Sequence, residues 1–399
     1  MLGLLGVLGL FTGCSEDREE QGQRVTFEVK PCLPDFTEEQ QEPTSLSRTT
    51  RTWTPPTGYV TYENMNGKFV QQNDLVHKSI EAFFTQDGET PLEGTFYYKQ
   101  DSWQISIEIE NTGDYYLYGF IPKEVAASAN ITGNSSFSEG AVLHLNELKT
   151  ITPSDVCVTI GAKEGSSADS DDTEGKRLTA GQYKVNTQAT GSPESPSSNK
   201  NYLFMLFDHL YSALRFGFLV GDTYDKVRTI KLTKLELKAT GEGDAKLKSK
   251  YDATVTLKAT DDGSSPIEEV TFTTSTGSTD VDYVTLFDSK QKEADFVTLT
   301  TSTPANFLGC FVPGQKYKTF TLRSTYNVYD KKGNLIRKGC VAENEINFKD
   351  LFKTESSDEV DTRKALRGHM YSLTLTVLPT YLYVLSDPDL DSPTVTVSN

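Results

Sequence analysis

Residues that could carry out catalysis are few and scattered in this 399-residue chain. It contains no GxSxG, HExxH or P-loop motif, the short patterns of serine hydrolases, zinc metalloproteases and phosphate-binding loops. The histidines stand far apart, at His77, His144, His209 and His369. We interpret each of them as a structural or surface residue, and we predict that the protein is not an enzyme.

Metal ligation is also poorly supported. Asp387, Asp389 and Asp391 have the spacing of the first ligands in a calcium-binding EF-hand loop, but Ser392 and Ser398 stand where that loop needs glycine and glutamate. We interpret this stretch as a charged turn between extended segments, with a weak surface calcium site as the alternative. The cysteines show no CxxC spacing and no neighbouring histidine pair, so no zinc site is expected. The sequence predicts no metal and no cofactor.

The N-terminal stretch predicts lipid attachment at Cys14. Residues 2–11 are apolar over the length of a signal-peptide core, which is too short for a helix that spans a bilayer. Small residues precede Cys14 and a polar, acidic stretch follows it, as at bacterial lipoprotein processing sites. We predict a signal peptide at 1–13 and a lipidated Cys14. An ordinary buried apolar segment is the alternative.

Two arginines, Arg48 and Arg51, stand in the stretch LSRTTRTWTPP at 46–56, which has neither helical nor strand periodicity. They are the only basic residues between Lys30 and Lys68, and they follow an acidic run. Exposed loops are where proteases reach the backbone, and arginine is a side chain that trypsin-like enzymes recognise. We predict cleavage after Arg51 rather than Arg48, since a cut there removes the whole acidic run. Two solvated loop arginines are the alternative.

The elements that surround these residues predict an all-β fold. Apolar and polar residues alternate in RVTFEVK, SWQISIEIE, YDATVTLK and YSLTLTV. Strands with one dry and one wet face are typical of antiparallel β-sandwiches. The net charge of -17 argues against nucleic acid as a partner, because nucleic acid attracts basic surfaces.

The length suggests two domains, and GEGDAK at 241–246 is the best candidate boundary. We expect an N-terminal domain at 14–242 and a C-terminal domain at 243–399. The first domain would contain a first strand at 24–30. It would also contain a cleavable loop at 32–56 and a long polar loop at 163–200.

Four local features are also expected. The apolar phase slips between Leu232 and Leu235, which predicts a bulge. We expect a hairpin in YNVYDKKGNLIRKG, with Gly333 and Asn334 in its turn. We expect a strand with a brief helical or bulged turn in LFDHLYSAL. Cys310 and Cys340, in strand-like segments of one half, are a candidate disulfide, with two buried thiols as the alternative.

Several longer patterns resemble the fimbrillins, the subunits of type V pili in Bacteroidetes. FMLFDHLYSALRFGF followed by VRTIKLTKLEL is similar to the core of their first domain, and GHMYSLTLTVLPTYLYVLSDPDLDSPTVTV to their C-terminal region. The resemblance implies two transthyretin-like antiparallel β-sandwich domains in tandem. It also implies a structural pilus subunit with a role in adhesion.

The resemblance further implies how such a subunit assembles. A trypsin-like surface protease cuts after an arginine in the loop that follows the first strand, and that strand leaves with the lipid anchor. A strand from another subunit then replaces it, which is donor-strand exchange. In this chain the displaced strand would carry Val25, Phe27 and Val29, each worth roughly 1.5–3 kcal/mol when buried. The donor must therefore offer comparable apolar content.

We predict residues 379–398 as the donor. Their apolar anchors would be Tyr381, Tyr383, Leu385, Val395 and Val397. An ordinary last strand of the second domain is the alternative. A tail that can be donated favours a stalk subunit over a tip or anchor subunit.

The expected partners are other pilus subunits, a trypsin-like surface protease and, through the lipid, the outer membrane. The expected location is the outer membrane and cell surface, and then the extracellular pilus. A different class, a glycan-binding surface lipoprotein, is the main alternative. Such proteins use exposed aromatic platforms, and here Trp53 lies in the arginine-bearing loop, while Trp103 is expected to be buried in a strand.

Overall fold

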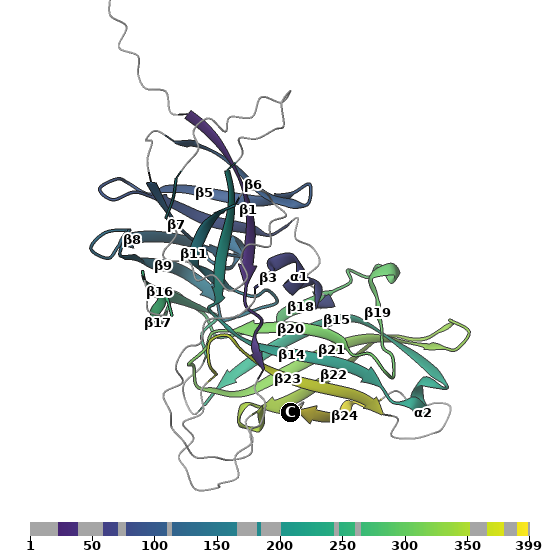
Figure 1. The fold of residues 1–399 in the computed structure, drawn as a ribbon. Helices are drawn as coiled ribbons and strands as arrows, with labels where there is room; N and C mark the ends of the chain where they lie inside the picture. The colour runs from purple at the N-terminus through teal and green to yellow at the C-terminus, as the bar shows by residue number, and fades with distance from the viewer. Residues whose placement is uncertain are drawn as a thin grey trace, which may run out of the picture.

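The computed structural model describes residues 23–38, 59–70, 77–109, 114–165, 182–184, 201–242, 247–259, 265–351, 365–378 and 389–397. These residues form mostly β-strands, as predicted, with two short α-helices, α1 (Tyr62–Gly67) and α2 (Asp222–Asp225). Within the described ranges no helix is long and apolar enough to cross a bilayer. The strands surround two hydrophobic cores, which lie one above the other in Figure 1.

The first core is enclosed by a large sheet that closes on itself. Its strand order is β11-β13-β1-β6-β5-β4-β7, and β7 also pairs with β11, so these strands form a ring. β12 extends the sheet beyond β7, and β3 pairs with β1. The strands are β1 (Gln23–Leu33), β3 (Val60–Thr61), β4 (Ser79–Thr85), β5 (Leu92–Lys99), β6 (Ser102–Ile109), β7 (Asp114–Ile121), β11 (Cys157–Gly165), β12 (Gln182–Lys184) and β13 (Asn201–His209).

A smaller antiparallel sheet contributes to the same core. Its strand order is β17-β16-β9-β8, and buried side chains of β8, β9 and β16 belong to the first core. The strands are β8 (Ser128–Gly133), β9 (Gly140–Lys149), β16 (Lys250–Lys258) and β17 (Ile267–Thr274).

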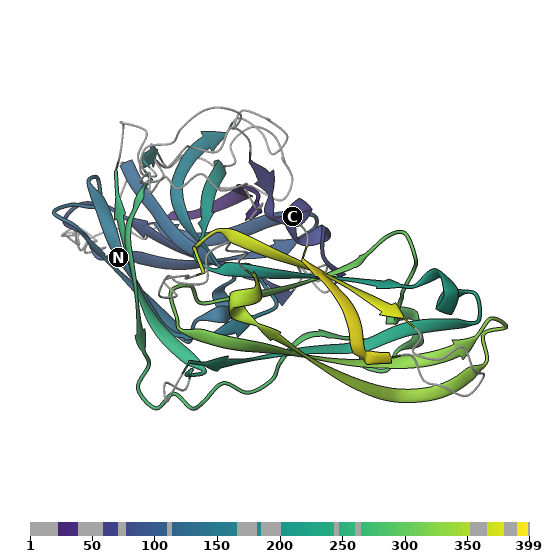
Figure 2. The same cartoon turned by 90° about the horizontal axis from the view of Figure 1, so that it is seen from below.

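Two further sheets face each other across the second core. One has the order β10-β20-β14-β23-β2, with β24 also paired to β23, and the other has the order β18-β15-β21-β22, with β19 paired to β15. Phe216 and Leu373 from the first of these sheets share the core with Leu235 and Phe320 from the second. Figure 2 shows the yellow strands β23 and β24 near the viewer.

The strands of the first of these sheets are β2 (Thr37–Glu38), β10 (Ile151–Thr152), β14 (Ser212–Val220), β20 (Ala305–Phe311), β23 (His369–Leu378) and β24 (Asp389–Val397). The strands of the second are β15 (Arg228–Gly241), β18 (Val284–Asp288), β19 (Val297–Thr298), β21 (Tyr317–Asp330) and β22 (Leu335–Asn347).

The division between the two cores does not follow the predicted boundary at 242/243. β14 and β15 precede that boundary but enclose the second core, whereas β16 and β17 follow it and join the first. The chain enters the second core directly after β13, through the buried residues Leu210 and Tyr211, where a helical or bulged turn was expected. Alternation shows which face of a strand is buried, but it does not show which strand lies beside it.

The predicted bulge and the predicted hairpin are both confirmed. The bulge is present, since the register of β15 against β21 shifts between Leu232 and Lys234. The hairpin joins β21 to β22, with Gly333 at a φ of 87° and the Asp330 carboxylate accepting the backbone N–H of Asn334. Gly333 is needed there because side-chain-bearing residues rarely adopt positive φ.

The candidate disulfide between Cys310 and Cys340 does not form. Cys310 lies in β20 and Cys340 in β22, which belong to different sheets around the second core. Nearness in sequence suggested a shared half of the molecule, but it could not show that the two strands lie on separate sheets.

β1 is an inner strand of the closed ring. It pairs parallel with β13, from Phe27 opposite Asn201 to Cys32 opposite Leu206, and antiparallel with β6 on its other edge. Val25 and Phe27 are fully buried and Val29 nearly so, as the alternation predicted. The first strand is therefore part of the core rather than a covering at its margin.

We predict that Phe27→Ala lowers the free energy of unfolding of the first core by about 3–5 kcal/mol, since it removes a fully buried aromatic ring. The measurement is urea unfolding followed by Trp103 fluorescence in a Trp53→Phe background. Thr26→Ala is the matched control, because Thr26 is half-buried on the opposite face of β1. Equal losses for the two variants would contradict the burial described here.

Candidate functional site

The N-terminal segment, residues 23–38, connects the two cores. β1 completes the ring around the first core, and β2 pairs parallel with the start of β23 in the second. Between them Phe36 is buried, and the backbone N–H of Thr37 donates to the carbonyl oxygen of Gly368 at 2.9 Å. One short stretch of chain thus contacts both halves of the structure.

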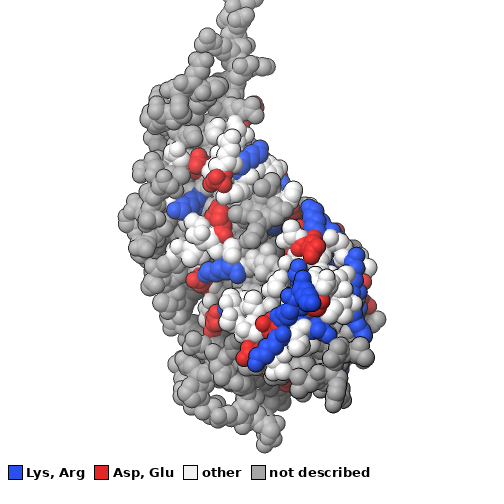
Figure 3. All heavy atoms as spheres, turned by 90° about the vertical axis from the view of Figure 1, so that its right-hand side faces the viewer, with Lys and Arg blue, Asp and Glu red and all other residues white. Residues whose placement is uncertain are grey.

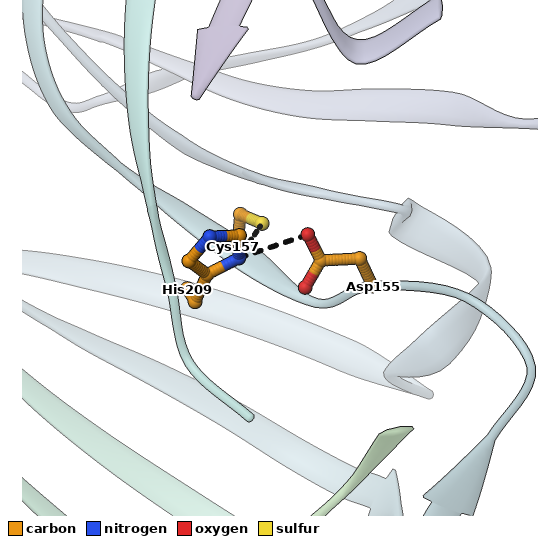
Figure 4. Close-up of side chains that lie close together, drawn as sticks. All are labelled: Asp155, Cys157 and His209. Carbon is orange, nitrogen blue, oxygen red and sulfur yellow. Dashed lines mark hydrogen bonds and ion pairs between the residues drawn. The ribbon is translucent and has the colours of Figure 1, made fainter. Parts of the chain in front are cut away.

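Three buried side chains, Asp155, Cys157 and His209, meet where this segment passes between the cores. His209 ends β13 and Cys157 begins β11, and the antiparallel pairing of these strands places the two residues opposite each other. Asp155 lies just before β11 (Figure 4). We call these three residues the His209 cluster.

The imidazole ring of His209 contacts the N-terminal segment both through its ring nitrogens and through the face of the ring. Its Nε2 lies 2.8 Å from the carbonyl oxygen of Pro34, and its Nδ1 lies 2.9 Å from Oδ2 of Asp155. A carbonyl oxygen only accepts hydrogen bonds, so Nε2 carries a proton that it donates. The ring of Phe36 stacks on the imidazole with centroids 3.9 Å apart.

The charges around His209 favour its protonated form. Burial alone lowers the pKa of His209, but the carboxylates of Asp155 and Asp208 and the Pro34 carbonyl outweigh burial and raise the pKa above 6.5. Arg367 supports the arrangement, since its Nη1 donates at 2.7 Å both to Asp208 and to the backbone oxygen of His209. We therefore interpret His209 and Asp155 as a buried imidazolium–carboxylate pair.

The Cys157 thiol is a poor nucleophile here. Burial, and then the charge of Asp155, raise its pKa well above the ordinary value of 9.0, so the thiol stays protonated. Its Sγ lies 3.7 Å from Nδ1 of His209, but Cys157 is fully buried and His209 almost fully buried. The cluster has the residue types of a cysteine–histidine catalytic pair without the accessibility that one needs.

The cluster could also be considered as a metal centre. The possible ligand atoms of Asp155, Cys157 and His209 lie within 4.8 Å of one another. Structural zinc sites use four protein ligands, whereas this group has three, and both ring nitrogens of His209 already have acceptors. The hydrogen bonds explain the arrangement of the imidazole, so we interpret the cluster as a polar clamp.

Two ion pairs at the surface add to the hold on the segment. Asp35 pairs with Lys68, which follows α1, and Glu38 accepts from Arg215 of β14 at 2.7 Å. Both pairs are largely exposed, so each contributes about 0–1 kcal/mol. On the face shown in Figure 3, basic and acidic side chains both occur, and the basic ones gather toward the lower right.

A cleft of about 260 Å³ lies beside β1. Tyr98, Trp103, Glu63 and Asp101 line it together with residues 28–30 of β1. Trp103 is buried, as expected, and its indole N–H donates to Glu63. Because β1 forms one wall, the cleft exists only while the N-terminal segment is in place.

Several residues singled out in the sequence lie outside the described residues: Cys14, Arg48, Arg51, Tyr381, Tyr383 and Leu385. Val395 and Val397 are in β24, opposite Leu375 and Leu373 of β23 in the same chain. Sequence reasoning placed His209 among structural or surface histidines and missed its link to Asp155 and Pro34. No local pattern marks that link, because its members are far apart in the chain.

Comparison with known proteins found similarity in three dimensions only. No family model matches the chain, and no curated protein sequence does. Among solved structures, a fimbrial protein from Bacteroides vulgatus shares 12% identity at a TM-score of 0.31, covering 94% of this chain and 98% of its own. The fimbrial anchor protein Mfa2 from Porphyromonas gingivalis shares 10% at a TM-score of 0.24, covering 92% and 95%.

A Bacteroides uniformis protein whose description suggests a role in cell adhesion shares 9% identity at a TM-score of 0.34, covering 94% and 96%. These matches extend over nearly the whole chain and carry names from the class that the sequence resemblance indicated. Since the TM-scores lie below 0.5, we draw no conclusion about function from them.

We predict that His209→Ala loosens the N-terminal segment. The change leaves the buried Asp155 carboxylate without its partner, so the free energy of unfolding falls by about 3–5 kcal/mol. Hydrogen exchange of the peptide that contains Thr37 speeds up, as measured by mass spectrometry. His144→Ala is the control, because that ring is half-buried and its Nδ1 lies 3.3 Å from the Thr254 hydroxyl, away from the N-terminal segment. Unchanged exchange at Thr37 would rule out the clamp.

The raised pKa of His209 predicts a pH dependence. A histidine whose pKa is raised on folding stabilises fully below its unfolded pKa of about 6.5, and this contribution is lost as the pH rises through the folded pKa. The Cys157 thiol stays neutral over this range, because burial and the charge of Asp155 raise its pKa well above 9.0. The stability difference between wild type and His209→Ala should therefore shrink as the pH rises above about 6.5 and through the raised pKa of His209. A difference that grows with pH would contradict this assignment.

Proposed function

We propose that this chain is a structural subunit, of the stalk type, in a surface pilus with a role in adhesion. It is exported as a lipoprotein anchored through Cys14 and activated by proteolysis in the loop that contains Arg48 and Arg51. One observation carries the proposal. The N-terminal segment completes both cores, yet it is joined to the remaining chain only through that predicted loop.

A cut in the loop would separate a complete structural piece. The N-terminal segment ends at Glu38, and the next described residue of the chain is Tyr59. Cleavage after Arg51 therefore breaks none of the described strands. Leaving with the lipid anchor, the segment would open the ring between β13 and β6 and expose the side chains that pack on Phe27. Such a groove has two unpaired strand edges, which favour the entry of another strand.

The tail at 379–398 is our candidate for that strand. It follows β23, whose edge also receives β2 of the N-terminal segment. A stalk subunit must both accept and donate a strand, and this chain has the elements for both roles. Its partners would be other pilus subunits and a trypsin-like surface protease, first at the outer membrane and then in the extracellular pilus.

A glycan-binding surface lipoprotein is the second candidate, and the cleft beside β1 favours it. Tyr98 and acidic side chains could contact a sugar there. This function requires the N-terminal segment to stay, since residues 28–30 form part of the cleft. The two candidates therefore differ in whether the segment is retained or lost.

We predict that limited trypsin treatment converts the purified full chain into a ladder of polymers on a gel, with a new N-terminus at Thr52. The double variant with Arg48→Ala and Arg51→Ala should prevent the ladder, because trypsin can cut after either arginine and the segment stays attached only when both are replaced. Arg48→Ala is the matched control and should polymerise as wild type does. A trimmed monomer that forms no polymer would overturn the pilus proposal and leave the glycan-binding alternative standing.

A further inference from the structure

We propose that the donated tail binds the next copy of this chain in one register, with residues 379–390 in the places of residues 25–36. Pro388, Asp389 and Leu390 would then occupy the places of Pro34, Asp35 and Phe36 at the His209 cluster. The inference rests on the proposed strand replacement and adds to it the contact that aligns the incoming strand.

The two stretches match in sequence at this offset. VTFEVKPCLPDF at 25–36 aligns with PTYLYVLSDPDL at 379–390 without a gap. Thr380 aligns with Thr26, Pro388 with Pro34, and Asp389 with Asp35. The Pro-Asp pair is followed by a large apolar residue in both stretches, Phe36 in one and Leu390 in the other.

Each of these matched residues has a described role in the N-terminal segment. The carbonyl of Pro34 accepts from His209, and in the proposed register the carbonyl of Pro388 would take that place, with φ restricted by the ring in both residues. Phe36 covers the face of the imidazole, which Leu390 could also cover. Asp35 pairs with Lys68, and Asp389 has the same charge and a side chain of the same length.

The register also puts the predicted anchors at inward positions of the first core. Tyr381 falls in the place of Phe27 and Tyr383 in the place of Val29, both buried positions. Tyrosine is larger than valine, and the cleft of about 260 Å³ adjoins Val29, which gives room for the extra volume. The outward-facing position of Thr26 receives Thr380.

The same offset continues into the second core. Thr37 and Glu38 pair in parallel with His369 and Met370 of β23. Extending that pairing places Val395 opposite Leu373 and Val397 opposite Leu375. These leucines are buried, and in the free chain the chain's own β24 covers them in antiparallel orientation.

β24 would accordingly be a placeholder on the edge of β23. When a chain donates its tail, β24 leaves and the tail of the neighbouring copy takes the vacated edge. At the corresponding positions the N-terminal segment continues with Gln41 and Pro43, whereas the tail offers two valines. The tail is therefore more apolar there than the stretch that it replaces.

Two buried positions receive a more polar residue, and the first is that of Cys32, where Ser386 falls. Asp387 falls in the place of Leu33, which is fully buried beside β3. A carboxylate buried without a partner weakens binding. The register therefore makes a specific claim about this residue, because a leucine in its place should bind more tightly.

Cysteine cross-linking between two copies tests the register. Thr26 pairs with Ser106 of β6, so Thr380→Cys in one copy should form a disulfide with Ser106→Cys in another after trypsin activation of the mixed full chains. Gln104→Cys and Glu108→Cys, two residues to either side along β6, are the controls. We expect cross-linked dimers mainly with Ser106→Cys.

The outcomes separate this inference from the proposed function. One adverse outcome is polymers that cross-link preferentially at Gln104→Cys or Glu108→Cys, and another is polymers that do not cross-link at all. Either result would overturn the register but would still support strand replacement. If no polymer forms, strand replacement itself is wrong and the register is wrong with it.

Asp387→Leu provides a second readout. Subunits joined through this variant tail should dissociate at least about tenfold more slowly in denaturant than wild-type polymers, as buried leucine replaces a buried charge. Asp391→Leu is the matched control, because it falls in the place of the exposed Thr37. Equal dissociation rates for the two variants would overturn the register.

Discussion

The hydrogen bonding of β1 along both of its edges is the constraint on which the structure depends. β13 lies on one side and β6 on the other, and through them the sheet closes into a ring. Within the described residues, closure of the ring gives each of its strands a partner on both sides, so the ring offers no open edge to uncontrolled pairing. Without β1, the facing edges of β13 and β6 would both be unpaired, and another strand could pair with the two of them.

The His209 cluster acts where that strand leaves the first core for the second. A surface contact would be weakened by solvent, but the pair between His209 and Asp155 lies in a buried, low-dielectric setting. It positions a backbone carbonyl and a ring face rather than a particular side-chain charge. Such a clamp places few demands on the side chains along most of a bound strand and selects the residues at one point only. This combination suits the recognition of extended segments.

The sequence predicted the local features of this fold well. The burial of Val25 and Phe27, the bulge before Lys234 and the turn at Gly333 all depend on residues close together in the chain. The wrong predictions concern partners. β16 joined the first core although it follows the expected boundary, and the strands of Cys310 and Cys340 belong to different sheets. His209 and Asp155 meet only because β11 pairs with β13, and no periodicity within either strand encodes that pairing.

The connection through Leu210 and Tyr211 has a mechanical consequence. Both residues are fully buried, and the Tyr211 hydroxyl donates to the backbone of Lys149 at 2.7 Å, so β13 and β14 are joined without slack. β1 runs parallel to β13, and β23 runs parallel to β14. A tensile load along these strands would act in shear on many backbone hydrogen bonds at once instead of peeling them apart singly. A load applied along β13 and β14 would therefore be shared between the two cores.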